Sequence, residues 1–304
     1  ATTYSTPVVQ GTFSPFSAEE GKWSTEFPIG VATNKIQWGG SASFAFGTGA
    51  FTVEGWAFVT ADNYDYSRLF AIGPYYNNAN SVGLTINHTD NSDKTSFYAY
   101  NAVNGAICLS TSATPRGEWF HWAVTRDSTG DFRLFTNGNL DSTNTSYRSV
   151  DISPGGNQPF VIGSTTDRAV SEPYEGFISN VRVVKGTAVY TSSFTPSTSP
   201  LTDITNTVLL TSCSNRHRDK SSIGQTITLT GEPRIKPFSP FAPSAAYDPA
   251  VNGGSGFFPN GIGGDSYLSV SDATDFDFGT GDYTLGAWFY PTLALIAIGN
   301  FNLP

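Results

Sequence analysis

The stretch Phe46-Gly47-Thr48-Gly49-Ala50-Phe51-Thr52-Val53-Glu54-Gly55-Trp56 returns near the end of the sequence in a closely similar form. The second version is Phe278-Gly279-Thr280-Gly281-Asp282-Tyr283-Thr284-Leu285-Gly286-Ala287-Trp288, and six of the eleven positions are identical. Two shorter stretches also recur in the same order: Phe13-Ser14-Pro15-Phe16 as Phe238-Ser239-Pro240-Phe241, and Ala71-Ile72-Gly73 as Ala297-Ile298-Gly299. Three matches in one order indicate a duplicated module.

The composition favours strands and turns over helices. The 304 residues include 31 Gly and 14% aromatic residues, and only 13% are charged. Aromatic and β-branched residues are enriched in strands, and no long stretch repeats its apolar residues with the 3.6-residue period of a helix. We therefore predict an all-β fold built of many short strands, as in a sandwich or barrel.

The expected strands follow short apolar or alternating runs separated by turn residues. They lie at 81–86, 95–100, 107–109, 118–126, 131–135, 160–163, 176–184 and 207–211. Asn137-Gly138 predicts a hairpin turn, because Asn-Gly supplies the positive φ angles of a type I′ turn. Residues 185–200, rich in Thr, Ser and Pro, predict a helix-like or turn-like pause.

Charge and cysteine content exclude several classes of function. A net charge of −9 with scattered basic residues argues against binding a nucleic-acid backbone. The short basic run at 216–220 is expected to form a solvated turn. No apolar run has membrane-spanning length, so no membrane insertion is expected. Cys108 and Cys213 form neither a metal cluster nor a disulfide framework, and we predict two buried free thiols.

Several stretches resemble a known family. Residues 49–56, 119–126 and 132–138 are similar to successive strands of the laminin-G-like, concanavalin-A-like jelly roll. Phe177 to Thr191, continuing to Phe194-Thr195-Pro196, resembles tandem modules of bacteriophage virion and tail-fibre proteins, notably those of marine phages. The resemblance implies an antiparallel jelly-roll sandwich followed by a second, partial copy. We expect its core to be anchored by Trp56, Trp119, Trp122 and Trp288.

This resemblance divides the chain into four parts. They are an N-terminal extended arm or strand (1–12), a laminin-G-like jelly-roll domain (13–213), a junction (214–237) and an incomplete second module (238–304). The second module has no counterparts of 119–126 or 177–184. Three explanations are open: the sequence is a fragment of a longer chain, the partial module pairs with another subunit, or the module folds in a reduced form. We favour the fragment, because an open core is costly.

Catalytic patterns are missing from the sequence. Retaining glucanases of this sandwich alternate carboxylates along one strand, whereas Glu54 stands alone on its expected strand and should face solvent. His88, His121 and His217 lie in no nucleophile or metal-binding motif, and His121 is expected to pack or to sit at an edge. We therefore expect a protein that is not an enzyme.

Two binding sites are possible in the loops at the rim. Ca²⁺ prefers several oxygen ligands, and two Asp-containing loops could supply them, although no cofactor is required. The candidate metal ligands are Asp62, Asp65, Asp90 and Asp93. A sugar would need an aromatic platform with amide hydrogen bonds. The candidate carbohydrate-binding residues are Tyr64, Tyr66, Tyr75, Tyr76, Asn77 and Asn78.

The sequence thus favours a structural or adhesion protein of a virion surface, in a tail fibre or on the capsid, and an extracellular location. Its expected partners are copies of itself or other virion subunits, with host-surface glycan as a further ligand. The alternative is a calcium-dependent lectin domain of a secreted or cell-surface protein. This sandwich hosts lectins, glycanases and structural domains alike, and a glycoside hydrolase ranks below both other hypotheses because the sequence lacks the alternating catalytic carboxylates.

Overall fold

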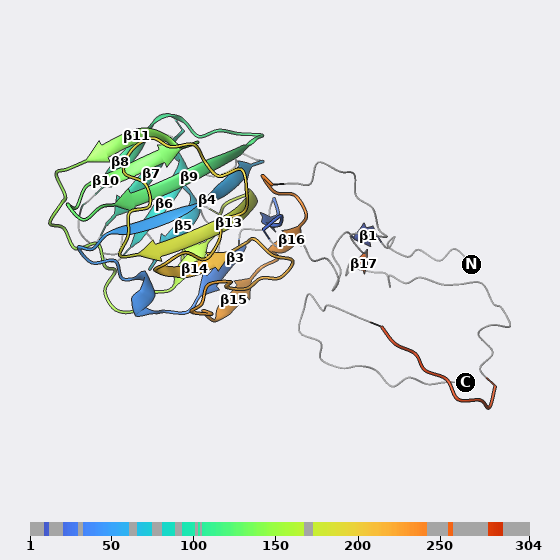
Figure 1. Cartoon of the computed structure of the whole chain (residues 1–304). Helices are drawn as coiled ribbons and strands as arrows, with labels where there is room; N and C mark the ends of the chain where they lie inside the picture. The colour runs from blue at the N-terminus through green and yellow to red at the C-terminus, as the bar shows by residue number, and fades with distance from the viewer. Residues whose placement is uncertain are drawn as a thin grey trace.

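The computed structural model describes residues 9–11, 21–29, 33–60, 66–74, 81–88, 93–100, 103, 105–166, 173–241, 255–257 and 279–287. Two antiparallel sheets pack face to face in these residues (Figure 1). This arrangement confirms the predicted all-β sandwich. The one helical element among the described residues is the short 3₁₀ turn η1 (Ala42–Phe44), so none of these residues forms a helix able to span a membrane.

The first sheet has eight strands in the order β11-β10-β9-β4-β13-β2-β16, with β14 also paired to β13. Its strands are β2 (Ser24–Phe27), β4 (Phe51–Val59), β9 (Trp119–Arg126), β10 (Phe132–Thr136), β11 (Asn139–Asn144), β13 (Gly176–Lys185), β14 (Thr207–Thr211) and β16 (Arg234–Lys236). On one side β13 pairs with β4 along most of its length. On its other side it pairs first with β2 and then with β14.

The second sheet has seven strands in the order β15-β3-β12-β5-β6-β7-β8. They are β3 (Lys35–Trp38), β5 (Ser67–Ile72), β6 (Val82–His88), β7 (Lys94–Ala99), β8 (Ala106–Ala113), β12 (Phe160–Ile162) and β15 (Ile227–Thr230). A separate pair joins β1 (Val9–Gly11) to β17 (Ser255–Phe257). Residues 214–237, expected to be a junction, thus include β15 and β16, which add one strand to each sheet.

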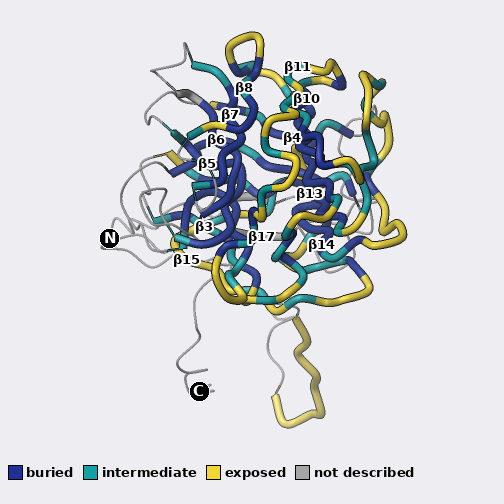
Figure 2. Tube along the Cα trace, turned by 90° about the vertical axis from the view of Figure 1, so that its left-hand side faces the viewer, coloured by how far each residue is buried: buried dark blue, intermediate teal, exposed yellow. Residues whose placement is uncertain are grey.

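The core lies between the sheets and follows from side-chain alternation along each strand. In β4, Phe51, Val53 and Ala57 belong to the buried core, while Glu54 and Trp56 lie on the opposite face of the strand. Figure 2 shows the buried residues concentrated along the two facing sheets. The core is aromatic at its centre, where Phe70 stacks on both Trp122 and Phe160 with centroid distances of 5.9 and 5.4 Å.

The outer face of the eight-stranded sheet is covered by the chain itself. Residues 185–200, expected to form a helix-like or turn-like pause, form no helix. The segment 187–204 crosses this face of the sheet. Tyr190 and Phe194 stack with ring centroids 3.6 Å apart, and Phe194 also packs on His121 at 5.6 Å. The Phe194 amide donates a hydrogen bond to the Gly138 carbonyl, which fixes this covering segment over the β10–β11 hairpin.

Candidate functional site

Glu54 occupies a sealed ionic cluster on the outer face of the eight-stranded sheet. Its side chain is fully buried. Oε1 accepts hydrogen bonds from Arg182 Nε at 2.9 Å and Nη2 at 2.6 Å. Oε2 lies 3.2 Å from His121 Nε2 and accepts a 2.8 Å hydrogen bond from the Tyr190 hydroxyl. The expectation that Glu54 faces solvent was wrong, because the segment carrying Tyr190 covers this part of the sheet.

The electrostatics of the cluster keep the Glu54 carboxylate charged. Burial acts to raise the pKa of Glu54, but the hydrogen bond with His121 and the charge of Arg182 outweigh it, so this pKa lies below its usual value. Burial, and then the Glu54 charge, raises the pKa of Tyr190. A carboxylate with both oxygens engaged and no solvent contact is suited to holding the covering segment in place.

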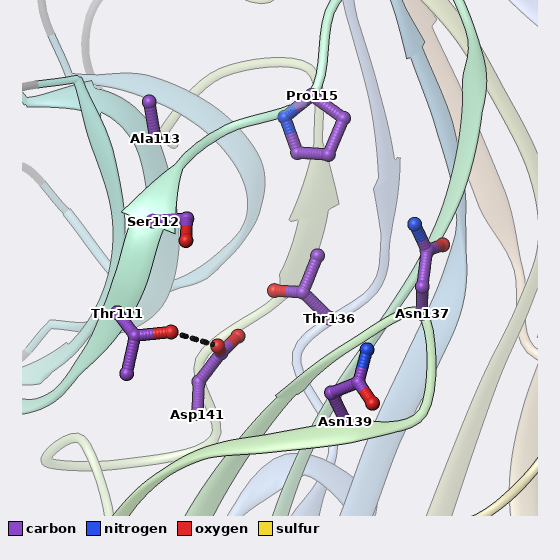
Figure 3. A pocket seen from close by; sticks show the side chains of 8 residues that line it. All are labelled: Thr111, Ser112, Ala113, Pro115, Thr136, Asn137, Asn139 and Asp141. Carbon is purple, nitrogen blue, oxygen red and sulfur yellow. Dashed lines mark hydrogen bonds between the residues drawn. The ribbon is translucent and has the colours of Figure 1, made fainter.

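An open pocket lies at the rim, where the edges of the two sheets meet. It has a volume of about 360 Å³, within the usual range of roughly 300–1,000 Å³ for ligand pockets. Figure 3 shows residues of β8 on one wall and residues of the β10–β11 hairpin on the other. Its lining is Thr111, Ser112, Ala113, Pro115, Thr136, Asn137, Asn139 and Asp141.

The hairpin that forms one wall is the one predicted at Asn137-Gly138. Asn137 has φ 50° and Gly138 has φ 76°, as a type I′ turn requires. Asn137 Oδ1 accepts a hydrogen bond from the His121 amide at 2.9 Å, which ties the turn to β9. The pocket wall is therefore held by backbone geometry and does not depend on a mobile side chain.

Asp141 is the polar centre of this pocket. Thr111 Oγ1 donates a 2.7 Å hydrogen bond to Asp141 Oδ1 and bridges the two sheets (Figure 3). Asp141 Oδ2 is shielded from solvent and accepts no hydrogen bond within the described part of the chain. A buried acceptor without a donor is costly, and the polar groups that a ligand meets in the pocket include the side chains of Thr136, Asn137 and Asn139.

The predicted carbohydrate-binding residues are only partly described. Tyr66 lies just before β5 with φ 61°. Tyr64, Tyr75, Tyr76, Asn77 and Asn78 lie outside the described residues. The pocket residues Thr111, Asn139 and Asp141 were missed, because strands far apart in sequence bring them together and none stands in a recognisable motif.

The predicted calcium ligands are described at one position. Asp93 has φ 59° and lies 3.9 Å from Arg116. Asp62, Asp65 and Asp90 lie outside the described residues. Within the described ranges, no three His, Cys, Asp or Glu side chains group closely enough to hold a metal ion.

The predicted core tryptophans divide between the two faces of the sheet. Trp122 is fully buried in the core. Trp56 and Trp119 are half-buried on the outer face, where they contact Phe241 and Phe238. Trp288 lies outside the described residues. Cys108 and Cys213 are free and buried, which confirms the prediction for both thiols.

Several solved structures are similar to this chain at low sequence identity. A candidate carbohydrate-binding protein from Bacteroides ovatus matches with a TM-score of 0.46 and 16% identity, over 72% of this chain and 60% of the other. Full-length tailspike protein 2 of an Escherichia coli O157:H7 bacteriophage matches with a TM-score of 0.40 and 13% identity, over 71% of this chain and 31% of the other. Domain 4 of an extracellular arabinanase from Geobacillus stearothermophilus, in complex with arabinotriose, matches with a TM-score of 0.35 and 17% identity, over 47% of this chain and 64% of the other. This chain thus spans less than two thirds of each of these three proteins.

No curated protein matches the sequence. The family profile of the concanavalin A-like lectin/glucanases superfamily, by contrast, matches residues 31–189. This match covers just over half of the 304 residues, and it includes β3 to β13 of the sandwich. The chain belongs to the concanavalin A-like lectin/glucanases superfamily.

Proposed function

We propose that this protein is a non-enzymatic adhesion component of a bacteriophage virion surface, in a tail fibre or on the capsid, and that its rim pocket binds a host-surface glycan. The observation that carries the glycan site is the open pocket itself, whose lining gathers hydroxyl and amide side chains around the Asp141 carboxylate. Sugars present many hydroxyl donors, and the Ala113 and Pro115 side chains offer an apolar contact for a sugar ring.

The arrangement of carboxylates supports binding without cleavage. Glycoside hydrolysis by the usual mechanisms needs two carboxyl groups about 5 to 9.5 Å apart across the scissile bond. The residues that line the pocket include one carboxylate, Asp141. Glu54 is sealed on the outer face of the sheet with both of its oxygens engaged.

A glycan array followed by calorimetry tests the binding site. The intact chain should bind a defined glycan, and Asp141→Ala should lower the affinity about tenfold or more, because a hydrogen bond to a charged group contributes about 1.5–3 kcal/mol. Asp282→Ala is the matched control, since Asp282 is an exposed aspartate outside the pocket. No glycan binding, or equal affinity in the Asp141 variant, would reject the site.

Three further measurements test the rest of the proposal. Binding should survive chelation, because the pocket supplies its own polar groups; loss with EDTA and recovery with Ca²⁺ would favour a calcium-dependent lectin. The bound glycan should be recovered uncleaved, and release of reducing ends would contradict the non-enzymatic assignment. Immunogold label on phage particles that carry the gene is expected at the tail fibre or capsid surface, and unlabelled particles would reject the virion location.

A further inference from the structure

The outer face of the eight-stranded sheet carries an aromatic surface at the end opposite the Tyr190 cover. Trp56, Phe58, Trp119 and Phe177 form it, and we call these four residues the outer aromatic surface. They come from the neighbouring strands β4, β9 and β13. Phe58 packs edge-to-face on Trp119 at 5.7 Å and on Phe177 at 6.1 Å. So large an apolar surface would be costly if left in water.

Residues Phe238-Ser239-Pro240-Phe241 cover this surface. The Phe238 ring lies 5.0 Å from Phe58, 5.1 Å from Trp119 and 4.8 Å from Phe177. The Phe241 ring packs edge-to-face on Trp56 at 5.5 Å. Phe241 and Ser239 are 7% and 3% exposed, while Phe238 remains 37% exposed. Both phenylalanines thus act as anchors on one receptor surface.

The tetrapeptide is internally ordered for this contact. Ser239 Oγ accepts a hydrogen bond from the Phe241 amide at 3.2 Å, which closes a local turn. Pro240 restricts its own φ and also the backbone of Ser239. A segment that is already bent loses less conformational entropy when it docks.

The same tetrapeptide stands at Phe13-Ser14-Pro15-Phe16, ahead of the first Phe-Gly-Thr-Gly stretch as residues 238–241 stand ahead of the second. The second tetrapeptide contacts the sandwich that precedes it in the chain. The first has the same side chains, and therefore the same complementarity to this surface. Because the two tetrapeptides stand at equivalent places in the repeat, the contact of residues 238–241 with the sandwich is a contact between one module and the next.

We propose that the outer aromatic surface is a receptor for the Phe-Ser-Pro-Phe segment, and that residues 13–16 of a second copy of this chain bind it when residues 238–241 release it. Such exchange joins copies head to tail, a heterologous contact that can extend beyond a dimer. The surface shares no residue with the rim pocket, so this inference is independent of glycan binding.

A peptide titration tests the receptor. The probe is a fluorescein-labelled peptide of residues 11–18, and the receptor is the full chain with Phe13→Ala, Phe16→Ala, Phe238→Ala and Phe241→Ala, which removes both internal competitors. Saturable binding is expected, at least tenfold tighter than to the unmodified chain, whose surface is covered. Adding Trp119→Ala, or replacing both phenylalanines of the peptide by alanine, should reduce binding at least tenfold. No binding to the folded four-fold variant, or equal binding to the unmodified chain, would overturn the receptor.

Light scattering tests the exchange between copies. The full chain carrying only Phe238→Ala and Phe241→Ala should associate as its concentration rises, and the four-fold variant should stay monomeric. A monomer at every concentration in the first variant would overturn binding by a second copy. If near-ultraviolet circular dichroism shows that the double variant has lost its fold, Phe238→Ala alone replaces it, because that side chain is already partly exposed. Association of the Phe238→Ala variant with rising concentration then supports binding by a second copy, and a monomer at every concentration overturns it.

Discussion

Arg182 holds the Glu54 carboxylate with two hydrogen bonds to one oxygen, from Nε at 2.9 Å and from Nη2 at 2.6 Å, on a face that the chain then seals from water. The third nitrogen of the guanidinium, Nη1, donates to the Thr202 carbonyl at 3.0 Å. The pair therefore links β4, β13 and the segment that covers them. All three guanidinium nitrogens of Arg182 and both carboxylate oxygens of Glu54 have hydrogen-bond partners. Removing either side chain therefore leaves several buried polar groups unpaired.

Replacing Glu54 by alanine should destabilise the fold by about 3–5 kcal/mol, because it leaves the Arg182 charge buried without its partner. Urea unfolding followed by tryptophan fluorescence measures this change. Glu232→Ala is the control, since Glu232 pairs with Arg234 in solvent, and it should cost less than about 1 kcal/mol. Equal losses in the two variants would contradict the role given to the cluster.

The stability of the sandwich should fall in acid through Glu54. The folded pKa of Glu54 lies below its usual value, so the unfolded chain takes up a proton first. The carboxylate therefore contributes full stability above the unfolded pKa of about 4.3, and loses it as pH falls through the folded pKa. Unfolding free energies measured between pH 7 and 3 should drop less steeply in Glu54→Gln, which starts from a lower stability. Parallel profiles would show that other carboxylates cause the acid loss.

Gly55→Ala should destabilise the first sandwich, although Ala287 stands at the equivalent position of the repeat. A Cβ at Gly55 would lie 2.8 Å from Trp122 Cζ2 and 3.2 Å from Val181 Cγ2. Overpacking of a core of this kind costs about 1–3 kcal/mol. Thermal unfolding should show the loss, whereas Gly39→Ala should leave the midpoint nearly unchanged, because nothing lies within 4 Å of a Cβ there. A midpoint for Gly55→Ala that matches Gly39→Ala would refute this packing argument.

Both cysteines should resist thiol reagents in the folded protein. Burial raises the pKa of Cys108 to about 12, and only the thiolate is reactive. Cys213 is 4% exposed. Ellman's reagent at pH 8 should detect no rapidly reacting thiol in buffer and two in guanidinium chloride. A thiol that reacts rapidly without denaturant would show that one of the two sites opens.

Strands with a clear pattern were predictable from sequence. The expected run 118–126 is observed as Trp119–Arg126, and the expected run 207–211 is observed as Thr207–Thr211. Alternation defines these strands because one face of each must enter the core. The hairpin at Asn137-Gly138 was also predictable, because the requirement for positive φ is local.

Environments created by distant segments were not predictable. Alternation put Glu54 on the outer face correctly, but its burial depends on Tyr190, 136 residues further along the chain. The rim pocket depends on a meeting of 111–115 with 136–141 across the edges of two sheets. Neither contact is marked by a local sequence motif, because each follows from the order of the strands in the folded sheets.

The stretch Phe46 to Trp56 and its repeat show this division most directly. In the first copy Phe51 and Val53 are fully buried in β4, between β9 and β13. In the second copy, residues 279–287 form no strand, and Tyr283 and Leu285 are 45% and 65% exposed. The sequence by itself determined the module, its alternation and its duplication. Only the tertiary structure decided which copy became a core strand, because a strand is stable when neighbouring strands pair with it and cover its apolar face.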